Sequence, residues 1–174
     1  LEGEEASFIA VVSKDKIIPL ATSQDHKAVG EGDVGLNTGG MGAYSPAPIV
    51  DERLHKKIIT EVMKPTMEGL ISEGSPYLGF LYAGLMIKDG ELKVLEFNCR
   101  FGDPETQPIL IRLQSSLVEL CLAAINEDMD SYNISWTNKH ACGVVIASEG
   151  YPESYESNKQ VTPVSYTHLR AHET

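Results

Sequence analysis

The sequence predicts an α+β fold in which a largely antiparallel sheet is flanked by helices. Segments rich in β-favouring residues follow one another in pairs separated by tight turns, which is typical of antiparallel hairpins. Longer segments place apolar residues at helical spacing. The expected strands are residues 6–13, 16–20, 79–88 and 91–98, and the expected helices are residues 51–74, 108–113 and 117–126.

The first predicted hairpin joins residues 6–13 to residues 16–20 through a tight turn at Lys14-Asp15. Residues 21–48 then show little apolar periodicity and contain many turn-forming residues, so we expect a long loop there. Loops of this length are uncommon inside compact domains and are often functional.

The helix predicted over residues 51–74 begins with Asp51, a residue that favours the N-cap position, and Gly74 is suited to end it. Its apolar stripe continues beyond Pro65. We therefore expect Pro65 to kink the helix rather than end it, unless two helices abut there. His55 is expected to be exposed.

The second predicted hairpin is centred on Asp89-Gly90, the strongest short turn signal in the chain. Both faces of residues 80–87 are apolar, so this strand should lie centrally in the sheet. A two-residue type I′ turn would leave a small residue, Ala83, opposite Glu96. The predicted pairs are Ile87 with Leu92, Leu85 with Val94, Ala83 with Glu96, and Leu81 with Asn98.

After the second hairpin, the chain continues with two predicted helices and one strand. The helices cover residues 108–113 and 117–126, and Ser116 begins a capping box for the second. A polar connection follows, and residues 141–147 are then expected to form an apolar strand.

Two polar side chains at the end of the second hairpin form a candidate metal site. Glu96 and Asn98 are two residues apart in a predicted strand, which puts both side chains on one face, about 7 Å apart at a rise of about 3.3 Å per residue. A carboxylate and an amide carbonyl are hard oxygen donors, which favour Mg²⁺ completed by water and substrate phosphates. The pair therefore implies a nucleotide site.

Directly after this strand come residues suited to anions and to a turn. Arg100 offers a fork of donors for phosphate or carboxylate. Gly102 permits a turn, and Asp103-Pro104-Glu105 forms a turn that feeds the next helix.

Two earlier motifs in residues 21–48 add candidate substrate ligands. Asp25 and Lys27 suit a substrate that bears an amine together with a phosphate or carboxylate. Gly39, Gly40 and Gly42 allow the backbone to approach a ligand closely and to turn successive N–H groups towards an anion.

Three stretches of this chain, residues 96–107, 24–27 and 37–46, resemble the phosphoribosylamine-glycine ligase family, ATP-grasp enzymes of purine biosynthesis. The motifs occur in the family's order, and the resemblance extends over about residues 1–163. It implies an ATP-grasp fold. It also implies a reaction in which ATP phosphorylates the carboxylate of glycine and the amine of 5-phosphoribosylamine attacks the acyl phosphate, giving glycinamide ribonucleotide, ADP and phosphate.

The resemblance implies a role for each candidate residue around the nucleotide. Glu96 and Asn98 would bind Mg²⁺, or Mn²⁺, together with ATP. Glu5 would bond the ribose of ATP. Arg100 would act catalytically by stabilising the transferring phosphoryl group or the acyl phosphate, and would also bind substrate.

The remaining candidates would hold the amine and the phosphoribosyl substrate. Asp25 and Lys27 would act there together with the glycine loop, residues 39–42. Asp103 would either orient Arg100 or cap the following helix.

The resemblance also implies how the chain is divided. Residues 1–138 would be the C-terminal portion of an ATP-grasp domain, and residues 139–163 the start of a small C-terminal domain. Residues 164–174 resemble a reading frame of a sequencing adapter and are excluded. We expect the chain to be a fragment that is inactive alone and binds ATP weakly.

Charge and composition exclude several classes of partner. Lysine and arginine number 14 against 25 acidic residues, a formal net charge of -11, which argues against nucleic acid or an anionic membrane as the principal partner. No apolar run is long enough for a membrane span. We expect a cytoplasmic protein that is a monomer or weak oligomer, with three free cysteine thiols.

Two other hypotheses remain open at this point. The chain could belong to another ATP-grasp carboxylate-amine ligase or carboxylase, which would keep Glu96 and Asn98 but use a different acceptor. It could also be a nucleotide-binding or degenerate scaffold module without catalysis.

Overall fold

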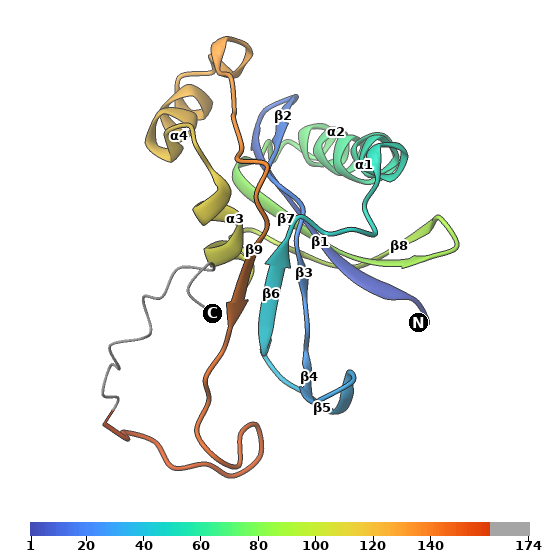
Figure 1. Ribbon diagram of the computed structural model, residues 1–174. Coiled ribbons are helices and arrows are strands. Elements are labelled where there is room, and N and C mark those ends of the chain that lie inside the picture. Colours follow the sequence, from blue (N-terminus) through green and yellow to red (C-terminus); the bar gives the residue numbers. More distant parts are fainter. Residues whose placement is uncertain (161–174) are drawn as a thin grey trace.

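A four-stranded antiparallel sheet lies at the centre of the computed structural model, which describes residues 1–160 (Figure 1). The strands lie in the order β2, β1, β7 and β8. Both predicted hairpins are confirmed, and the predicted central strand, β7, is an inner strand. The bounds are β1 Glu4–Ser13, β2 Lys16–Pro19, β7 Leu78–Lys88 and β8 Glu91–Asn98.

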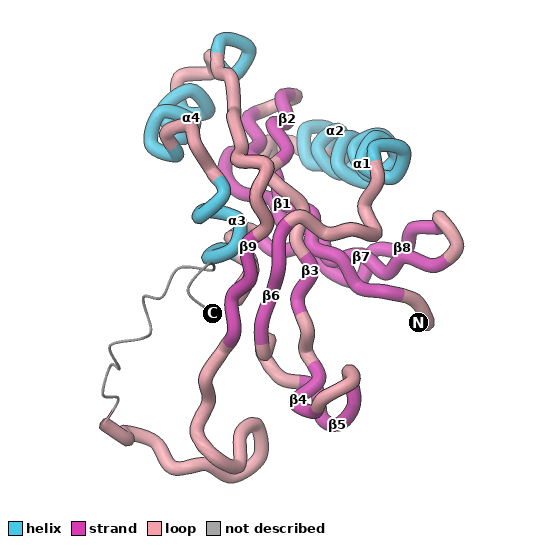
Figure 2. The backbone as a smooth tube through the Cα atoms, in the orientation of Figure 1, coloured by secondary structure: helices cyan, strands magenta, loops and turns pink. Residues whose placement is uncertain are grey.

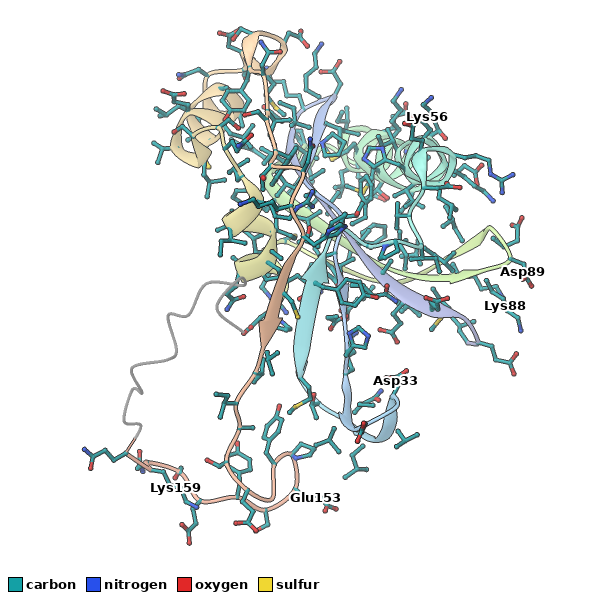
Figure 3. All side chains as sticks on the ribbon, viewed as in Figure 1. Asp33, Lys56, Lys88, Asp89, Glu153 and Lys159 are labelled. Atoms are coloured by element: carbon teal, nitrogen blue, oxygen red, sulfur yellow. The ribbon has the colours of Figure 1, made fainter. Side chains whose placement is uncertain are left out.

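The hairpin turns have the backbone conformation that their sequences predict. Asp89 and Gly90 have φ angles of 52° and 79°, and a type I′ turn requires positive φ at both central residues. Figure 3 shows Lys88 and Asp89 at the tip of the β7–β8 hairpin, away from the two helices that follow the hairpin in the sequence. The conformation of a two-residue turn depends mainly on the turn residues themselves, which is why the sequence predicts it well.

The register of β8 differs from the prediction beyond Val94. Ile87 pairs with Leu92 and Leu85 with Val94, as expected, but a β-bulge then leaves Leu95 as an extra residue. Because the bulge shifts the remaining pairs by one, the predicted partners of the metal-site residues are wrong. The observed pairs are Gly84 with Glu96 and Tyr82 with Asn98, in place of Ala83 with Glu96 and Leu81 with Asn98.

One face of the sheet is covered by a continuous helical layer made of α1 Glu52–Ile58, a π-helical segment η1 Ile59–Met63, and α2 Lys64–Ser72. Asp51 caps it as predicted, since its Oδ1 accepts a hydrogen bond from the Leu54 N–H at 2.7 Å. Pro65 stands in the first turn of α2, directly after the π-helical segment. The helical path therefore continues past Pro65, as the apolar stripe predicts.

Gly74 ends this layer with a φ of 76°. The N–H of Gly74 bonds to the carbonyl of Ile71 and that of Ser75 to the carbonyl of Leu70, the Schellman pattern. The expectation that His55 is exposed is wrong. Its ring lies 5.1 Å from that of Phe8, and burial lowers its pKa.

The larger core lies between this helical layer and the sheet. Alternate side chains of β1 and β7 point towards it, as expected for strands buried on that face. The strands contribute Ala6, Phe8, Ala10, Val12, Leu81, Ala83, Leu85 and Ile87, and the helices contribute Leu54, Ile58, Val62, Met63 and Met67.

The opposite face of the sheet is covered at one end by α3 Thr106–Arg112, α4 Leu117–Ile125 and the 3₁₀ turn η2 Met129–Ser131. Figure 2 shows α4 and the α1–α2 layer on different sides of the strands. Ser116 caps α4, accepting a hydrogen bond from the Glu119 N–H at 3.2 Å. The second core contains Ile9, Val11, Leu20, Tyr82, Ile109, Leu120, Ala124 and Met129.

The prediction that residues 21–48 form a long loop is wrong, because short strands occupy much of this segment. Strands of two to four residues carry too little periodicity for the sequence to reveal them. β3 Gln24–Asp25 and β6 Gly42–Ser45 form a three-stranded sheet with β9 Ala141–Val144, while β4 Ala28–Gly30 and β5 Val34–Asn37 form a separate hairpin (Figure 1).

The predicted strand at residues 141–147 is present as the shorter β9, which pairs with β6. The division of the chain at residue 138 stays a prediction. The predicted adapter segment, residues 164–174, lies outside the described residues. Within residues 1–160, no helix has the length and hydrophobicity needed to cross a membrane.

Candidate functional site

Polar residues of β1 and β8 lie on the sheet face opposite the α1–α2 layer, at the end beyond α3 and α4. The register places Ser7 beside Gly84, and Gly84 beside Glu96. Directly paired residues of antiparallel strands present their side chains on the same face. The face opposite the α1–α2 layer therefore becomes polar where α3 and α4 no longer cover it.

Glu96 and Asn98 lie side by side on this face. Nδ2 of Asn98 donates a hydrogen bond to Oε1 of Glu96 at 3.2 Å, so the two side chains point the same way, as strand alternation predicts. Glu96 is exposed to solvent and Asn98 is half-buried. The pair is thus accessible from outside rather than enclosed in apolar packing.

A small pocket of about 70 Å³ opens beside this pair. It gathers most of the residues that the sequence predicts for the site, from strands and loops far apart in the chain. The lining residues are Asp25, Lys27, Gly39, Tyr82, Glu96, Asn98, Arg100, Gly102, Asp103 and Glu105. We call this the acidic pocket.

A larger polar pocket of about 400 Å³ adjoins the acidic pocket and shares Asp25 and Lys27 with it. Glu5 lines this second pocket, and its Oε2 lies 3.2 Å from Nζ of Lys27. Burial disfavours the charge on Lys27, but the carboxylates of Asp25 and Glu5 outweigh that effect and raise its pKa. Lys27 therefore stays cationic where the two pockets meet.

Asp25 is only 7% exposed, in the short strand β3. Burial, followed by the negative charge of Glu105, raises the pKa of Asp25 to about 6. A carboxyl group with this pKa changes its protonation near neutral pH, unlike an ordinary aspartate.

Glu105 is a buried residue of the acidic pocket that sequence reasoning missed, since it was assigned only to a turn. It is 2% exposed, and its Oε1 accepts a hydrogen bond from Ser7 Oγ at 2.7 Å. Ser7 Oγ also lies 3.0 Å from the hydroxyl of Tyr82. The other oxygen, Oε2, is buried with no hydrogen-bond partner among the described residues.

The glycine loop has its N–H groups engaged within the chain. The N–H of Gly39 donates to the hydroxyl of Tyr151 at 3.2 Å, and that of Gly40 donates to Thr38 Oγ1 at 2.9 Å. Gly42 lies in β6, paired with Val144, outside the acidic pocket. Of the three glycines, only Gly39 lines the acidic pocket.

Arg100 and Asp103 both line the acidic pocket but are not joined to each other. The guanidinium of Arg100 donates to the carbonyl of Phe101 at 2.8 Å. No hydrogen bond or ion pair links Asp103 to Arg100 within residues 1–160, and the N-cap of α3 is Glu105. Neither role that the sequence suggested for Asp103 is visible, and its function stays a prediction.

A comparison with known protein families identifies the family to which this chain belongs. Residues 1–106 match the family described as phosphoribosylglycinamide synthetase, ATP-grasp (A) domain. The chain belongs to the phosphoribosylglycinamide synthetase family.

Relatives in this family are named phosphoribosylamine-glycine ligase. The protein from Allochromatium vinosum is 63% identical over 163 residues, and that from Vibrio parahaemolyticus is 57% identical over 163 residues. Each match covers 93% of this chain and 38% of the relative. The chain thus spans well under half the length of the ligases that it matches.

A solved structure of the same family confirms the fold. The crystal structure of phosphoribosylamine-glycine ligase from Thermotoga maritima aligns with a TM-score of 0.74 at 37% sequence identity, covering 90% of this chain and 39% of that chain. The α+β, ATP-grasp prediction is therefore correct.

Members of the ATP-grasp superfamily use ATP and typically a divalent metal, and the polar pair fits such an ion. Within the described residues, no three histidine, cysteine, aspartate or glutamate side chains are grouped to hold a metal. Mg²⁺ commonly takes one or two protein oxygens and completes its shell with water and phosphate oxygens. The exposed carboxylate of Glu96 and the amide oxygen of Asn98 match that requirement, once the Asn98 side chain turns its oxygen outwards.

Proposed function

We propose that this chain provides metal- and substrate-binding groups of an ATP-dependent ligase that joins glycine to 5-phosphoribosylamine in purine biosynthesis. The products are glycinamide ribonucleotide, ADP and phosphate, formed through a glycyl phosphate intermediate. The observation that carries the proposal is the Glu96–Asn98 pair on one sheet face, beside a pocket that also contains Lys27 and Arg100.

Around the nucleotide, each residue has a definite task. Glu96 and Asn98 hold Mg²⁺, or Mn²⁺, which when bound neutralises phosphate charge. Glu5, in the larger polar pocket, binds the ribose of ATP. Arg100 donates to the phosphoryl oxygens during transfer and to the acyl phosphate afterwards. Phosphoryl transfer depends mainly on such positioning and charge neutralisation, so no nucleophilic side chain is needed.

The residues shared by the two pockets bind the acceptor substrate, phosphoribosylamine. Lys27 remains cationic and suits a phosphate or carboxylate, and Asp25 suits an amine. Gly39 of the glycine loop and Asp103, which both line the acidic pocket, complete the binding of the phosphoribosyl substrate. The partners are therefore small molecules, with no nucleic acid or membrane involved. We expect a cytoplasmic monomer or weak oligomer.

A chimeric ligase tests this proposal, because the chain covers only part of its relatives. In it, residues 1–163 replace the matching segment of the Allochromatium vinosum protein, which is 63% identical. We expect phosphate release that requires ATP, Mg²⁺, glycine and phosphoribosylamine together. Residues 1–163 alone should show no turnover.

Two results would contradict the proposal. One is phosphate release by the chimeric ligase that depends on a carboxylate other than glycine. The other is a folded chimera that retains ATP binding but never responds to glycine. Omitting each substrate in turn distinguishes these cases.

A further inference from the structure

Arg112, the last residue of α3, is a buried cation without a carboxylate partner. It is only 8% exposed, and within residues 1–160 it forms no ion pair. Burying a charge that no opposite charge balances is costly. An arginine kept in such a place therefore has a role that outweighs this cost.

The guanidinium of Arg112 joins α3 to β6 and to the segment before β9 through neutral oxygens. Nη1 donates to Oγ of Ser45 in β6 at 2.8 Å. Nε donates to the carbonyl of Lys139 at 2.9 Å, and Nη2 donates to the carbonyl of Thr137 at 3.3 Å. Figure 1 shows β6 and β9 side by side, with α3 next to the start of β9. Arg112 thus fixes the start of β9 relative to the end of β6.

The register of β9 on β6 has little support from side-chain packing. The four residues of β9 are alternately half-buried and exposed, and none is fully buried. Strand register is weakly specified where no side chain is buried on either face. The bonds of Arg112 lie directly before the first pair of the two strands, Ala141 with Ser45, so they fix the register where the pairing begins.

The chain after β9 holds the glycine loop, residues 39–42, at two points. The N–H of Val145 donates to the carbonyl of Met41 at 2.9 Å, and the hydroxyl of Tyr151 accepts from the N–H of Gly39 at 3.2 Å. Gly39 in turn lines the acidic pocket. A shift of β9 along β6 by one residue, about 3.3 Å, would separate both pairs.

We propose that Arg112 is a positioning residue for the acceptor substrate: by fixing the register of β9 on β6, it holds the glycine loop in place to bind phosphoribosylamine. The inference rests on the proposed ligase function and deepens it. Arg112 lines neither the acidic pocket nor the larger polar pocket, so it acts through the strands and not by contact with a substrate.

The role requires the shape of arginine as well as its charge. A planar guanidinium presents its N–H donors in fixed directions, which suits three acceptors on separate segments. A lysine ammonium keeps the charge but is a flexible point donor. Methionine keeps much of the apolar bulk and removes every donor. The two substitutions therefore separate the contribution of the bonds from that of the charge.

The test compares the chimeric ligase with its Arg112→Met variant. The backbone bond from the Thr137 N–H to the carbonyl of residue 112, at 2.9 Å, does not depend on the side chain. We expect the KM for phosphoribosylamine to rise about ten-fold, with the KM values for ATP and glycine within about two-fold of those of the parent. Arg53→Met, at an exposed site of α1, is the matched control and should change no constant.

The pattern of the three KM values separates positioning from general structural support. Loss of folded protein would lower kcat and leave every KM unchanged, and a general loosening of the site would raise all three together. Either result, in a chimera that still requires glycine, would overturn this inference and leave the ligase proposal standing. If the parent chimera never responds to glycine, the ligase proposal fails, and this inference fails with it.

A disulfide between the two strands tests the register directly. Tyr44 of β6 pairs with Cys142 of β9, and directly paired residues of antiparallel strands have Cα atoms about 4.5–5.5 Å apart, within the range of a disulfide. Tyr44→Cys is therefore combined with Arg112→Met, and the Tyr44→Cys variant alone is the reference.

We expect oxidation of this double variant to return the KM for phosphoribosylamine to within about three-fold of the oxidised reference. Reduction should raise it again about ten-fold. The same KM in both redox states, with the disulfide formed in one of them, would overturn the proposed role.

Arg112→Lys covers the case in which Arg112→Met does not fold. Because the ammonium keeps the charge but cannot reproduce the three fixed bonds, we expect an intermediate rise of about three-fold in the KM for phosphoribosylamine. The KM for ATP should again stay close to that of the parent. An unchanged KM for phosphoribosylamine in this variant would contradict the assignment.

Discussion

Gly84 lies directly opposite Glu96, and a Cβ atom added to Gly84 would stand 3.2 Å from Cγ of Glu96. The same added atom would lie 3.3 Å from Cε1 of Tyr82. The candidate metal carboxylate is therefore held above a strand position that has no side chain. This close approach makes Gly84 part of the site even though it has no functional group.

The first prediction concerns this contact. Gly84→Ala should displace the Glu96 carboxylate by a few tenths of an ångström and weaken Mg²⁺ binding about ten-fold in the chimeric ligase. Activity measured against Mg²⁺ concentration checks this. Gly69→Ala in α2 is the control, because an added Cβ there meets nothing within 4 Å. Equal Mg²⁺ dependence in both variants would refute the predicted role.

The second prediction concerns the metal ligands themselves. Glu96→Ala and Asn98→Ala should each lower glycine-dependent phosphate release at least about 100-fold. Since neither side chain is fully buried, circular dichroism and the melting temperature should stay close to those of the parent. Glu91→Ala, at an exposed site of the same strand, should retain activity. Retained activity in Glu96→Ala would remove this residue from metal binding.

The third prediction concerns pH. The folded-state pKa of Asp25, about 6, lies above its ordinary value of 3.8 because of burial and the nearby Glu105 charge. The folded state thus binds this proton more tightly than the unfolded state, and the contribution of Asp25 to stability falls as pH rises from about 4 to 6. The unfolding free energy of Asp25→Asn relative to that of the parent should therefore be larger at pH 7 than at pH 4. The gain is about 1–2 kcal/mol after allowance for solvent screening.

Urea unfolding of both forms between pH 4 and pH 8 measures this effect. The difference in unfolding free energy should grow across the interval from pH 4 to 6 and then level off. A difference independent of pH would show that the Asp25 carboxyl is not perturbed.

The fourth prediction concerns the tyrosine that bonds to the glycine loop. Tyr151→Phe removes the hydrogen bond to the N–H of Gly39 and should raise the KM for phosphoribosylamine about two- to ten-fold. Its effect on the KM for ATP should be smaller. Tyr155→Phe, which keeps the ring that packs against Tyr151 at 5.4 Å, is the control. Identical kinetics for the two variants would show that Tyr151 does not position the loop.

Features governed by neighbouring residues could be predicted from the sequence. The Asp89-Gly90 turn, the Asp51 cap and the Gly74 stop depend on backbone preferences within a few positions, and the structure contains all three. The shared face of Glu96 and Asn98 follows from strand alternation in the same way.

Features governed by distant contacts could not be predicted. Glu105 becomes a buried pocket residue through Ser7, 98 residues earlier in the chain, and no local pattern marks that contact. The β-bulge at Leu95 is likewise set by how β8 fits β7, and its sequence looks like an ordinary strand. Half-burial of His55 depends on packing against Phe8.

The bulge at Leu95 decides which face of β8 carries the Glu96 carboxylate. If the same sequence paired without the bulge, Glu96 would stand beside Ala83, a residue of the core beneath α1 and α2. The carboxylate would then point into hydrocarbon without the change of a single functional group. Any transplant of this hairpin into another scaffold must therefore preserve the bulge between Val94 and Glu96.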